Sequence, residues 1–180
     1  MKTVDKYTFQ ALDNYPYWLE GTIESLDYAL SYDAKNTMAL NLYGRIYAEQ
    51  LLDYETAKQY FQEALGINIH SLAVYAHYIQ TLLLNEDYEE AAKLIDFALT
   101  IKGIDKSEML LKKVLLLERT NELKKALRLL KDVKLSIFSN ETYETDEVEK
   151  RLKAKKELLS GKKKAKKAAD GKGKKKRKRK

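Results

Sequence analysis

The sequence predicts an all-α protein built from stacked helical hairpins, and three observations lead to that prediction. A pattern beginning Asp53-Tyr54-Glu55 recurs 34 residues later as Asp87-Tyr88-Glu89, and a fixed period in this range is typical of stacked repeats. The small and apolar residues within each copy follow helical spacing. The chain of 180 residues also contains only one proline and seven glycines, as expected of a chain that is helical almost throughout.

The helix that follows each Asp-Tyr-Glu sequence has one apolar face in which small and large residues alternate. In the first copy this face consists of Tyr54, Ala57, Phe61, Ala64 and Leu65. The alanines allow a neighbouring helix to approach closely, while the aromatic residues fill the space beside them. Asp53 is expected to cap the free N–H groups of this helix, and Asp87 those of the helix in the next copy.

Another helix is expected before each of these. Two sets of residues share the offsets 0, 3, 4 and 7 and so lie on one helical face: Leu40, Tyr43, Gly44 and Tyr47 in one copy, and Tyr75, Tyr78, Ile79 and Leu82 in the next. Each unit is therefore predicted to be two antiparallel helices joined by a short turn.

These residues resemble the tetratricopeptide repeat, which has a bulky, a small and an aromatic residue in its first helix and Ala, an aromatic and Ala in its second. The match is carried by Leu40, Gly44, Tyr47, Tyr54, Ala57, Phe61, Ala64, Tyr75, Leu82, Tyr88, Ala91, Ile95 and Ala98. The chain departs from the family at Ile79, which replaces the small residue, in lacking the usual proline between repeats, and in one extra residue near Leu52. The resemblance implies an α-solenoid with a concave groove lined by the first helices.

We expect about four such repeats in residues 1–138, with approximate bounds 3–36, 37–71, 72–104 and 105–138. The outer two are degenerate, as is usual for ends that face water. Pro16 is expected in the first turn of the second helix. Residues 139–161 are expected to form a connector and a helix that caps the array. In that helix Asp146 and Glu149 resemble a capping box, Val148, Leu152 and Leu159 form an apolar stripe, and Gly161 ends the helix.

Charge divides the chain into two opposed parts. Residues 1–149 hold 16 Lys/Arg and 25 Asp/Glu, whereas residues 150–180 hold 18 Lys/Arg and two acids. Residues 162–180 are a low-complexity Lys/Arg-rich segment that cannot bury enough apolar surface to fold, and we expect it to be disordered. The acidic and basic parts are expected to meet different partners.

The resemblance implies that a partner protein binds in the groove, as a peptide or a helix. The groove residues that we expect are Asn41, Arg45, Glu49, Ala73, His77, Gln80, Leu111, Lys112 and Leu115. For each of these residues taken singly, an ordinary solvated position is the more favoured interpretation. Ala73 and His77 interrupt the Lys, Asn and Arg set with which co-chaperone repeats hold a C-terminal carboxylate, so we do not expect that specificity.

No catalytic, cofactor or metal site is expected. Cysteine is absent, and the only histidines, His70 and His77, are seven residues apart with no thiolate nearby, whereas zinc sites need three or four ligands. Neither a glycine-rich phosphate loop nor a Gly-x-Ser-x-Gly sequence is present in the chain. We therefore expect a non-catalytic adaptor. The oligomeric state is left open.

A dense cationic cluster is predicted to bind a polyanion. It comprises Lys174, Lys175, Lys176, Arg177, Lys178, Arg179 and Lys180, and such a cluster attracts phosphate backbones without reading their sequence. RNA, DNA or a ribosome surface would suit it, so the alternative function is a nucleic-acid- or ribosome-associated protein in which the tail is the main binding element. A solubilising tail, or one that folds back on the acidic part, explains the same residues. The sequence has no apolar run that would span a bilayer. The expected location is the cytoplasm, or the nucleus if the source is eukaryotic.

Overall fold

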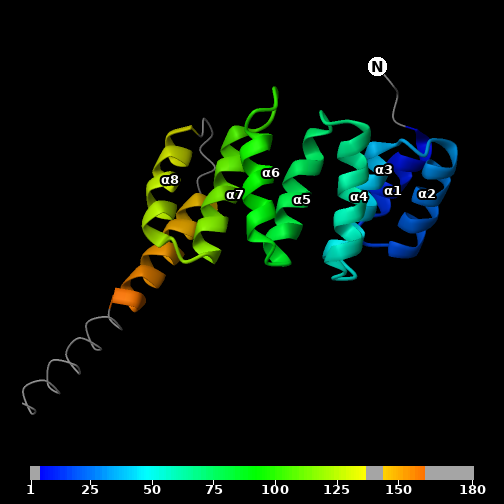
Figure 1. Ribbon diagram of the computed structural model, residues 1–180. Coiled ribbons are helices and arrows are strands. Elements are labelled where there is room, and N and C mark those ends of the chain that lie inside the picture. The colour runs from blue at the N-terminus through cyan, green and yellow to red at the C-terminus, as the bar shows by residue number, and fades with distance from the viewer. Residues whose placement is uncertain (1–4, 137–143, 161–180) are drawn as a thin grey trace, which may run out of the picture. The chain divides into compact units, whose positions relative to one another are not determined.

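The computed structural model describes residues 5–136 and 144–160, and every regular element in these ranges is an α-helix (Figure 1). The prediction of an all-α protein is therefore confirmed. The helices are α1 (Lys6–Asn14), α2 (Leu19–Tyr32), α3 (Thr37–Glu49), α4 (Tyr54–Ile67), α5 (Leu72–Leu84), α6 (Tyr88–Ala98), α7 (Lys106–Arg119) and α8 (Leu123–Ser136). A further helix, the terminal helix, occupies residues 144–160.

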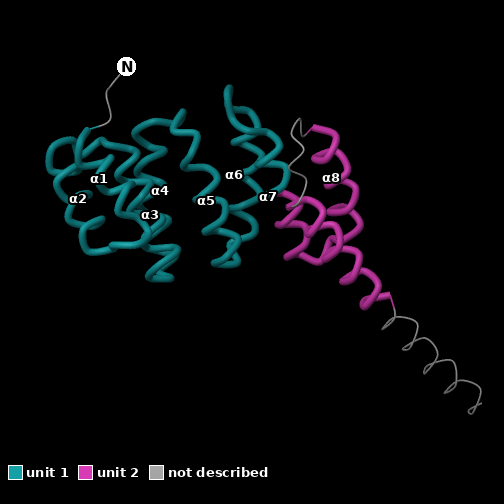
Figure 2. The backbone as a smooth tube through the Cα atoms, turned by 180° about the vertical axis from the view of Figure 1, so that it is seen from behind, with its two compact units in different colours: residues 1–112 teal, residues 113–180 magenta. Residues whose placement is uncertain are grey.

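The chain forms two compact units, residues 1–112 and residues 113–180, which Figure 2 shows in separate colours. Unit 1 contains α1 to α6 and the first half of α7. Unit 2 contains the second half of α7, α8 and the terminal helix.

Helices that are adjacent in sequence pack together in unit 1. The pairs α1 and α2, α3 and α4, and α5 and α6 are each in contact, as are α2 with α3 and α4 with α5. In addition, α1 contacts α3 and α3 contacts α5. The first helices of successive pairs therefore lie beside one another, which gives them a shared surface.

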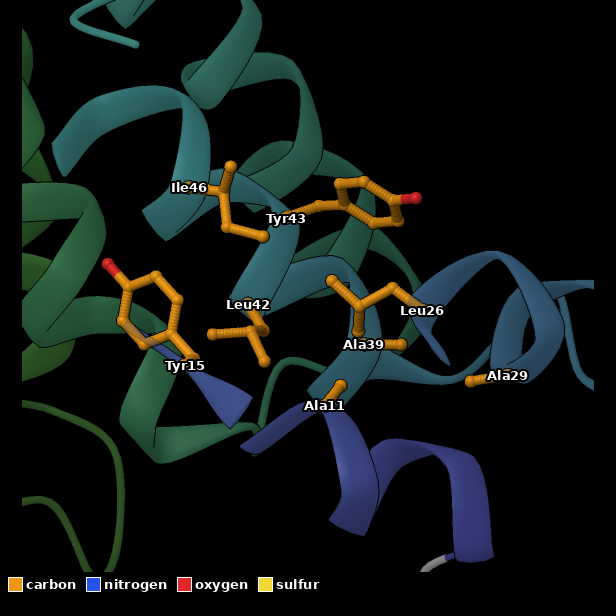
Figure 3. Packing of buried hydrophobic residues seen from close by; sticks show 8 residues of the cluster. All are labelled: Ala11, Tyr15, Leu26, Ala29, Ala39, Leu42, Tyr43 and Ile46. Carbon is orange, nitrogen blue, oxygen red and sulfur yellow. The ribbon is translucent and has the colours of Figure 1, made fainter. Parts of the chain in front are cut away.

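A hydrophobic cluster joins the first three helices of unit 1. Figure 3 shows its buried members, which are Ala11, Tyr15, Leu26, Ala29, Ala39, Leu42, Tyr43 and Ile46. The alanines of the cluster are fully buried, so the backbones of α1, α2 and α3 can approach closely at these points.

The predicted repeat pattern agrees with the observed burial. Ala57 and Ala64 of α4 are fully buried, and so are Ala91 and Ala98 of α6 at the same places in the period. Phe61 and Ile95, which are also equivalent, are both fully buried. The apolar face that the sequence predicts for the second helices is thus the face that enters the core.

Gly44 allows the closest approach between α3 and α4. A Cβ atom built on Gly44 would lie 2.5 Å from Cε1 of Phe61, far inside the normal 3.5–4.0 Å contact between carbon atoms. The ring of Phe61 therefore occupies the space that any other residue at position 44 would need. The equivalent pair in the next repeat is Ile79 and Ile95. There, two side chains of equal size replace the combination of no side chain at Gly44 and a large ring at Phe61.

The turn inside each helix pair repeats as well. Leu52, Glu86 and Asn121 all have positive φ, of 55°, 64° and 61°, and each stands directly before the residue that precedes the second helix. The N–H of Asp87 then donates to the carbonyl of Leu82, five residues earlier, whereas the N–H of Asp53 donates to Tyr47, six residues earlier. The extra residue expected near Leu52 therefore lies in this turn.

Of the two predicted caps, one is confirmed and one is wrong. Asp53 accepts a hydrogen bond from the N–H of Thr56 at 3.1 Å and caps α4. Asp87 makes no such bond to α6. Its carboxylate instead accepts hydrogen bonds from Lys58 Nζ at 2.8 Å and from Asn85 Nδ2 at 2.7 Å. Lys58 of α4 carries a full positive charge, which makes it a stronger partner for the carboxylate than a backbone N–H group.

The position predicted for Pro16 is also wrong. It lies in the turn between α1 and α2, not in the first turn of α2, which begins at Leu19. The N–H groups of Tyr17 and Trp18 both donate to the carbonyl of Asn14 at 2.9 Å. These two bonds form a turn at the end of α1, and α2 begins only after that turn.

In unit 2 an ion cluster fixes the terminal helix to α7. Glu118 is buried, and its carboxylate accepts two hydrogen bonds of 2.8 Å from Arg151 and one of 2.6 Å from Lys155. The pKa of Glu118 is lowered to about 2, chiefly by the bonds from Arg151 and against the effect of burial. The carboxylate therefore remains charged at neutral pH.

The predicted details of the terminal helix are partly right. Val148 and Leu152 are buried, whereas Leu159 is 42% exposed and lines a surface hollow beside the start of α8. The predicted capping box is wrong, since Asp146 lies inside a helix that already exists at residue 144. Asp146 and Glu149 both bind Lys134 Nζ instead, at 2.6 and 2.5 Å. Gly161 lies outside the described residues.

Candidate functional site

The candidate site is the surface shared by the first helices of unit 1. Because α1 contacts α3 and α3 contacts α5, side chains that these helices do not bury against their second helices can meet. We call the set Tyr15, Arg45, Glu49, His77, Gln80 and Lys112 the polar row.

Tyr15, Arg45 and Glu49 form one end of the polar row. The Tyr15 hydroxyl donates to Glu49 Oε2 at 2.5 Å, and Arg45 Nε donates to Glu49 Oε1 at 3.1 Å. The guanidinium carbon of Arg45 also lies 4.7 Å from the centre of the Tyr15 ring, within the range of a cation–π contact. Each of the three side chains thus fixes the other two.

The same contacts set the charges at this end. Burial alone would raise the pKa of Glu49, but the hydrogen bonds from Arg45 and Tyr15 lower it overall. Burial, together with the bond to Glu49, raises the pKa of Tyr15. At neutral pH the group therefore contains a carboxylate, a guanidinium and a neutral phenol.

His77 lies next in the polar row, on α5. Burial is the main reason that its pKa falls to about 4, and the positive charges of Arg45 and Lys112 lower it further, while Glu49 acts in the opposite direction. His77 is therefore neutral at physiological pH and offers one donor and one acceptor nitrogen. A histidine fully exposed on a helix surface would not show this lowering of the pKa.

Lys112 and Gln80 form the other end. Lys112 Nζ donates to Gln80 Oε1 at 3.0 Å, which links the first half of α7 to α5. Asn41, one helical turn before Arg45 on α3, has a buried Oδ1 that accepts no hydrogen bond from the described residues. A buried acceptor without a donor is costly, so a donor from a bound peptide could satisfy it.

The structure brings most of the predicted groove residues together within unit 1. Arg45, Glu49, His77, Gln80 and Lys112 all belong to the polar row, and Ala73 is exposed one turn before His77. Leu111 is half-buried in unit 1, whereas Leu115 belongs to unit 2.

Tyr15 is the member that sequence reasoning missed. It follows α1 and has no counterpart at the aromatic positions of the repeat. The only feature of the sequence that could have indicated its role is its position 34 residues before Glu49, which is one repeat period.

The predicted polyanion-binding residues, 174–180, lie outside the described residues. Within the described ranges, no group of three or more His, Asp or Glu side chains is arranged to hold a metal ion. None of the helices in those ranges is both long enough and apolar enough to cross a bilayer.

The polar row is rich in hydrogen-bonding groups and flanked by small residues. It offers charged donors from Arg45 and Lys112, and a donor and an acceptor nitrogen from His77. Asn41 adds an acceptor beside the row, and Ala73 is exposed one turn before His77. Such a mixture suits recognition of a polypeptide by hydrogen bonds and close backbone approach. The chain matches no protein-family model and no curated protein.

Proposed function

We propose that the protein is a non-catalytic adaptor whose repeats are tetratricopeptide-like and whose first helices bind a peptide or a helix of a partner protein. One observation carries the proposal: α1 contacts α3 and α3 contacts α5, and two hydrogen-bonded groups of polar side chains, Tyr15 with Arg45 and Glu49 and Lys112 with Gln80, lie on this series of helices with His77 between them in the row. Tyr15 is buried at one end of the row, whereas Arg45, His77, Gln80 and Lys112 are half-buried and keep part of their surface accessible to a partner.

The contacts of the row also favour binding over a purely structural role. Arg45, Glu49 and Tyr15 hold one another in a single arrangement, so little side-chain entropy remains to be lost when a partner binds. The Oδ1 of Asn41 accepts no hydrogen bond within the described part of the chain and so offers the partner an acceptor. A cytoplasmic or, in a eukaryote, nuclear location suits this role.

A matched pair of substitutions tests the groove. Peptides are selected from a display library against the full chain, and their affinities are measured by fluorescence anisotropy. Ala73→Arg places a long side chain beside His77 and should weaken the selected peptides by about tenfold or more, equivalent to about 1.4 kcal/mol. Gln59→Arg makes the same addition at an exposed site of α4, away from its buried face, and should leave binding unchanged. Equal effects of the two substitutions would show that the peptides bind elsewhere.

The reversal of charge along the chain favours a second function, in which the tail binds a polyanion such as nucleic acid or a ribosome surface. Replacing the cations of residues 174–180 with glutamine should then remove salt-sensitive polyanion binding while the selected peptides still bind. If peptide binding disappears as well, the proposed division between groove and tail is wrong.

A further inference from the structure

Unit 2 contains a surface hollow whose lining includes no residue of the polar row. Its volume is about 620 Å³, and it lies between the start of α8 and the end of the terminal helix. The residues that line it are Asn121, Glu122, Leu123, Lys124, Lys125, Arg128, Lys156, Leu159 and Ser160. Four of them are cations and only Glu122 is acidic.

Three acids of unit 2 form ion pairs with cations outside the hollow. Glu118 is bound to Arg151 and Lys155, and Asp146 and Glu149 are bound to Lys134. Within the hollow, Glu122 pairs with Lys125. No acidic partner is recorded for the other three cations among the residues that the structure describes. We call this set, Lys124, Arg128 and Lys156, the cation trio.

The repeat pattern shows that this charge is unusual for the fold. Glu55 and Glu89 stand in the first turns of α4 and α6, where acidic side chains are favourable. The equivalent position in α8 is Lys124, and no acid is found in the first turn of that helix. Cations near the start of a helix oppose its dipole and repel one another. A local arrangement that costs stability in this way is expected at a functional site.

We infer that the hollow binds the phosphate backbone of a nucleic acid. Lys124 and Arg128 are one helical turn apart on α8, and Lys156 faces the same hollow from the terminal helix, so cations approach a bound strand from two sides. No lining residue is aromatic, and base stacking therefore plays no part. The site recognises the backbone and not the base sequence.

Two features favour a nucleic-acid strand over other anions. The sequence continues beyond the terminal helix with Lys162, Lys163 and Lys164, so positive charge extends along the chain as a polymer of phosphates requires. The cations also border the hollow from two different helices, so they can contact successive phosphates along one strand.

The test removes the cation trio from the full chain. Binding of a labelled oligothymidylate is measured over a range of salt for the variant K124Q/R128Q/K156Q. The slope of log K against log salt should fall by about two, since each phosphate contact on a single strand contributes roughly 0.7. The control variant K93Q/K102Q/K106Q removes three exposed cations from unit 1 with the same change in net charge, and its slope should equal that of the wild type.

A single substitution separates binding from folding. Lys124→Glu restores the acid found in the two preceding repeats, so it should raise the melting temperature of the free protein while lowering its affinity for the oligonucleotide. Equal slopes for wild type and the trio variant would overturn the inference, and the polyanion proposal for the tail would still stand on its own variant. Loss of binding to phosphatidylserine vesicles by the trio variant, with oligonucleotide binding intact, would also overturn it.

Discussion

Replacing Gly44 with alanine should destabilise unit 1 although alanine is the better helix former. The added methyl group would lie 2.5, 2.7 and 2.8 Å from three ring atoms of Phe61. Phe61 is fully buried and stacks on Tyr78 with ring centres 5.6 Å apart, so the ring cannot move aside without disturbing α5. Overpacking of this kind costs about 1–3 kcal/mol.

Helix propensity acts in the opposite direction, and a second glycine measures it. Gly66 lies in α4, and a Cβ atom built there has no neighbour within 4 Å. Gly66→Ala should therefore stabilise the protein by up to about 1 kcal/mol. The difference between the two glycine substitutions isolates the clash with Phe61, which we expect to be about 1–3 kcal/mol.

Urea unfolding followed by circular dichroism gives both free energies. The variant Phe61→Ile, which copies Ile95 of the next repeat, should lose stability alone but rescue Gly44→Ala, because the smaller side chain leaves room for the methyl group. The two changes should then couple by about 1 kcal/mol or more. Additive free energies, or a stabilising Gly44→Ala, would refute the close contact.

Two further predictions concern the turns and unit 2. Leu52→Gly and Glu86→Gly should each raise the free energy of unfolding by about 0.5–1 kcal/mol. The left-handed backbone at these residues costs about 1–2 kcal/mol, which glycine avoids, and the greater entropy of glycine in the unfolded chain offsets part of that gain. The control Leu51→Gly, at a neighbouring residue without positive φ, should lower the free energy of unfolding. Glu118→Gln should weaken the attachment of residues 144–160 by about 1–3 kcal/mol, seen as faster amide exchange there, whereas Glu157→Gln at an exposed site should not. Since the pKa of Glu118 falls from 4.5 to about 2 on folding, its contribution should be complete above about pH 4.5 and disappear as the pH falls toward 2; a flat profile over that range would contradict the assignment.

The sequence alone was enough to predict the helices and their pairing. The 34-residue period, the helical spacing and the alternation of alanine with large residues all arise from local chemistry and from packing faces that recur in each repeat. Ala57 and Ala91 are buried for the reason that their spacing indicated. Residues on such a face are constrained by the helix itself, so the sequence records them directly.

Contacts between distant residues could be known only from the tertiary structure. Asp87 pairs with Lys58 instead of capping its helix, and Tyr15 joins Arg45 and Glu49, because the partner that a polar side chain selects depends on which helices adjoin. The grouping of cations in unit 2 depends on tertiary structure for the same reason, since Lys124 and Lys156 are far apart in the chain and come together only around the hollow. Apolar periodicity therefore determined the architecture, whereas the positions of charged groups were decided by packing between helices.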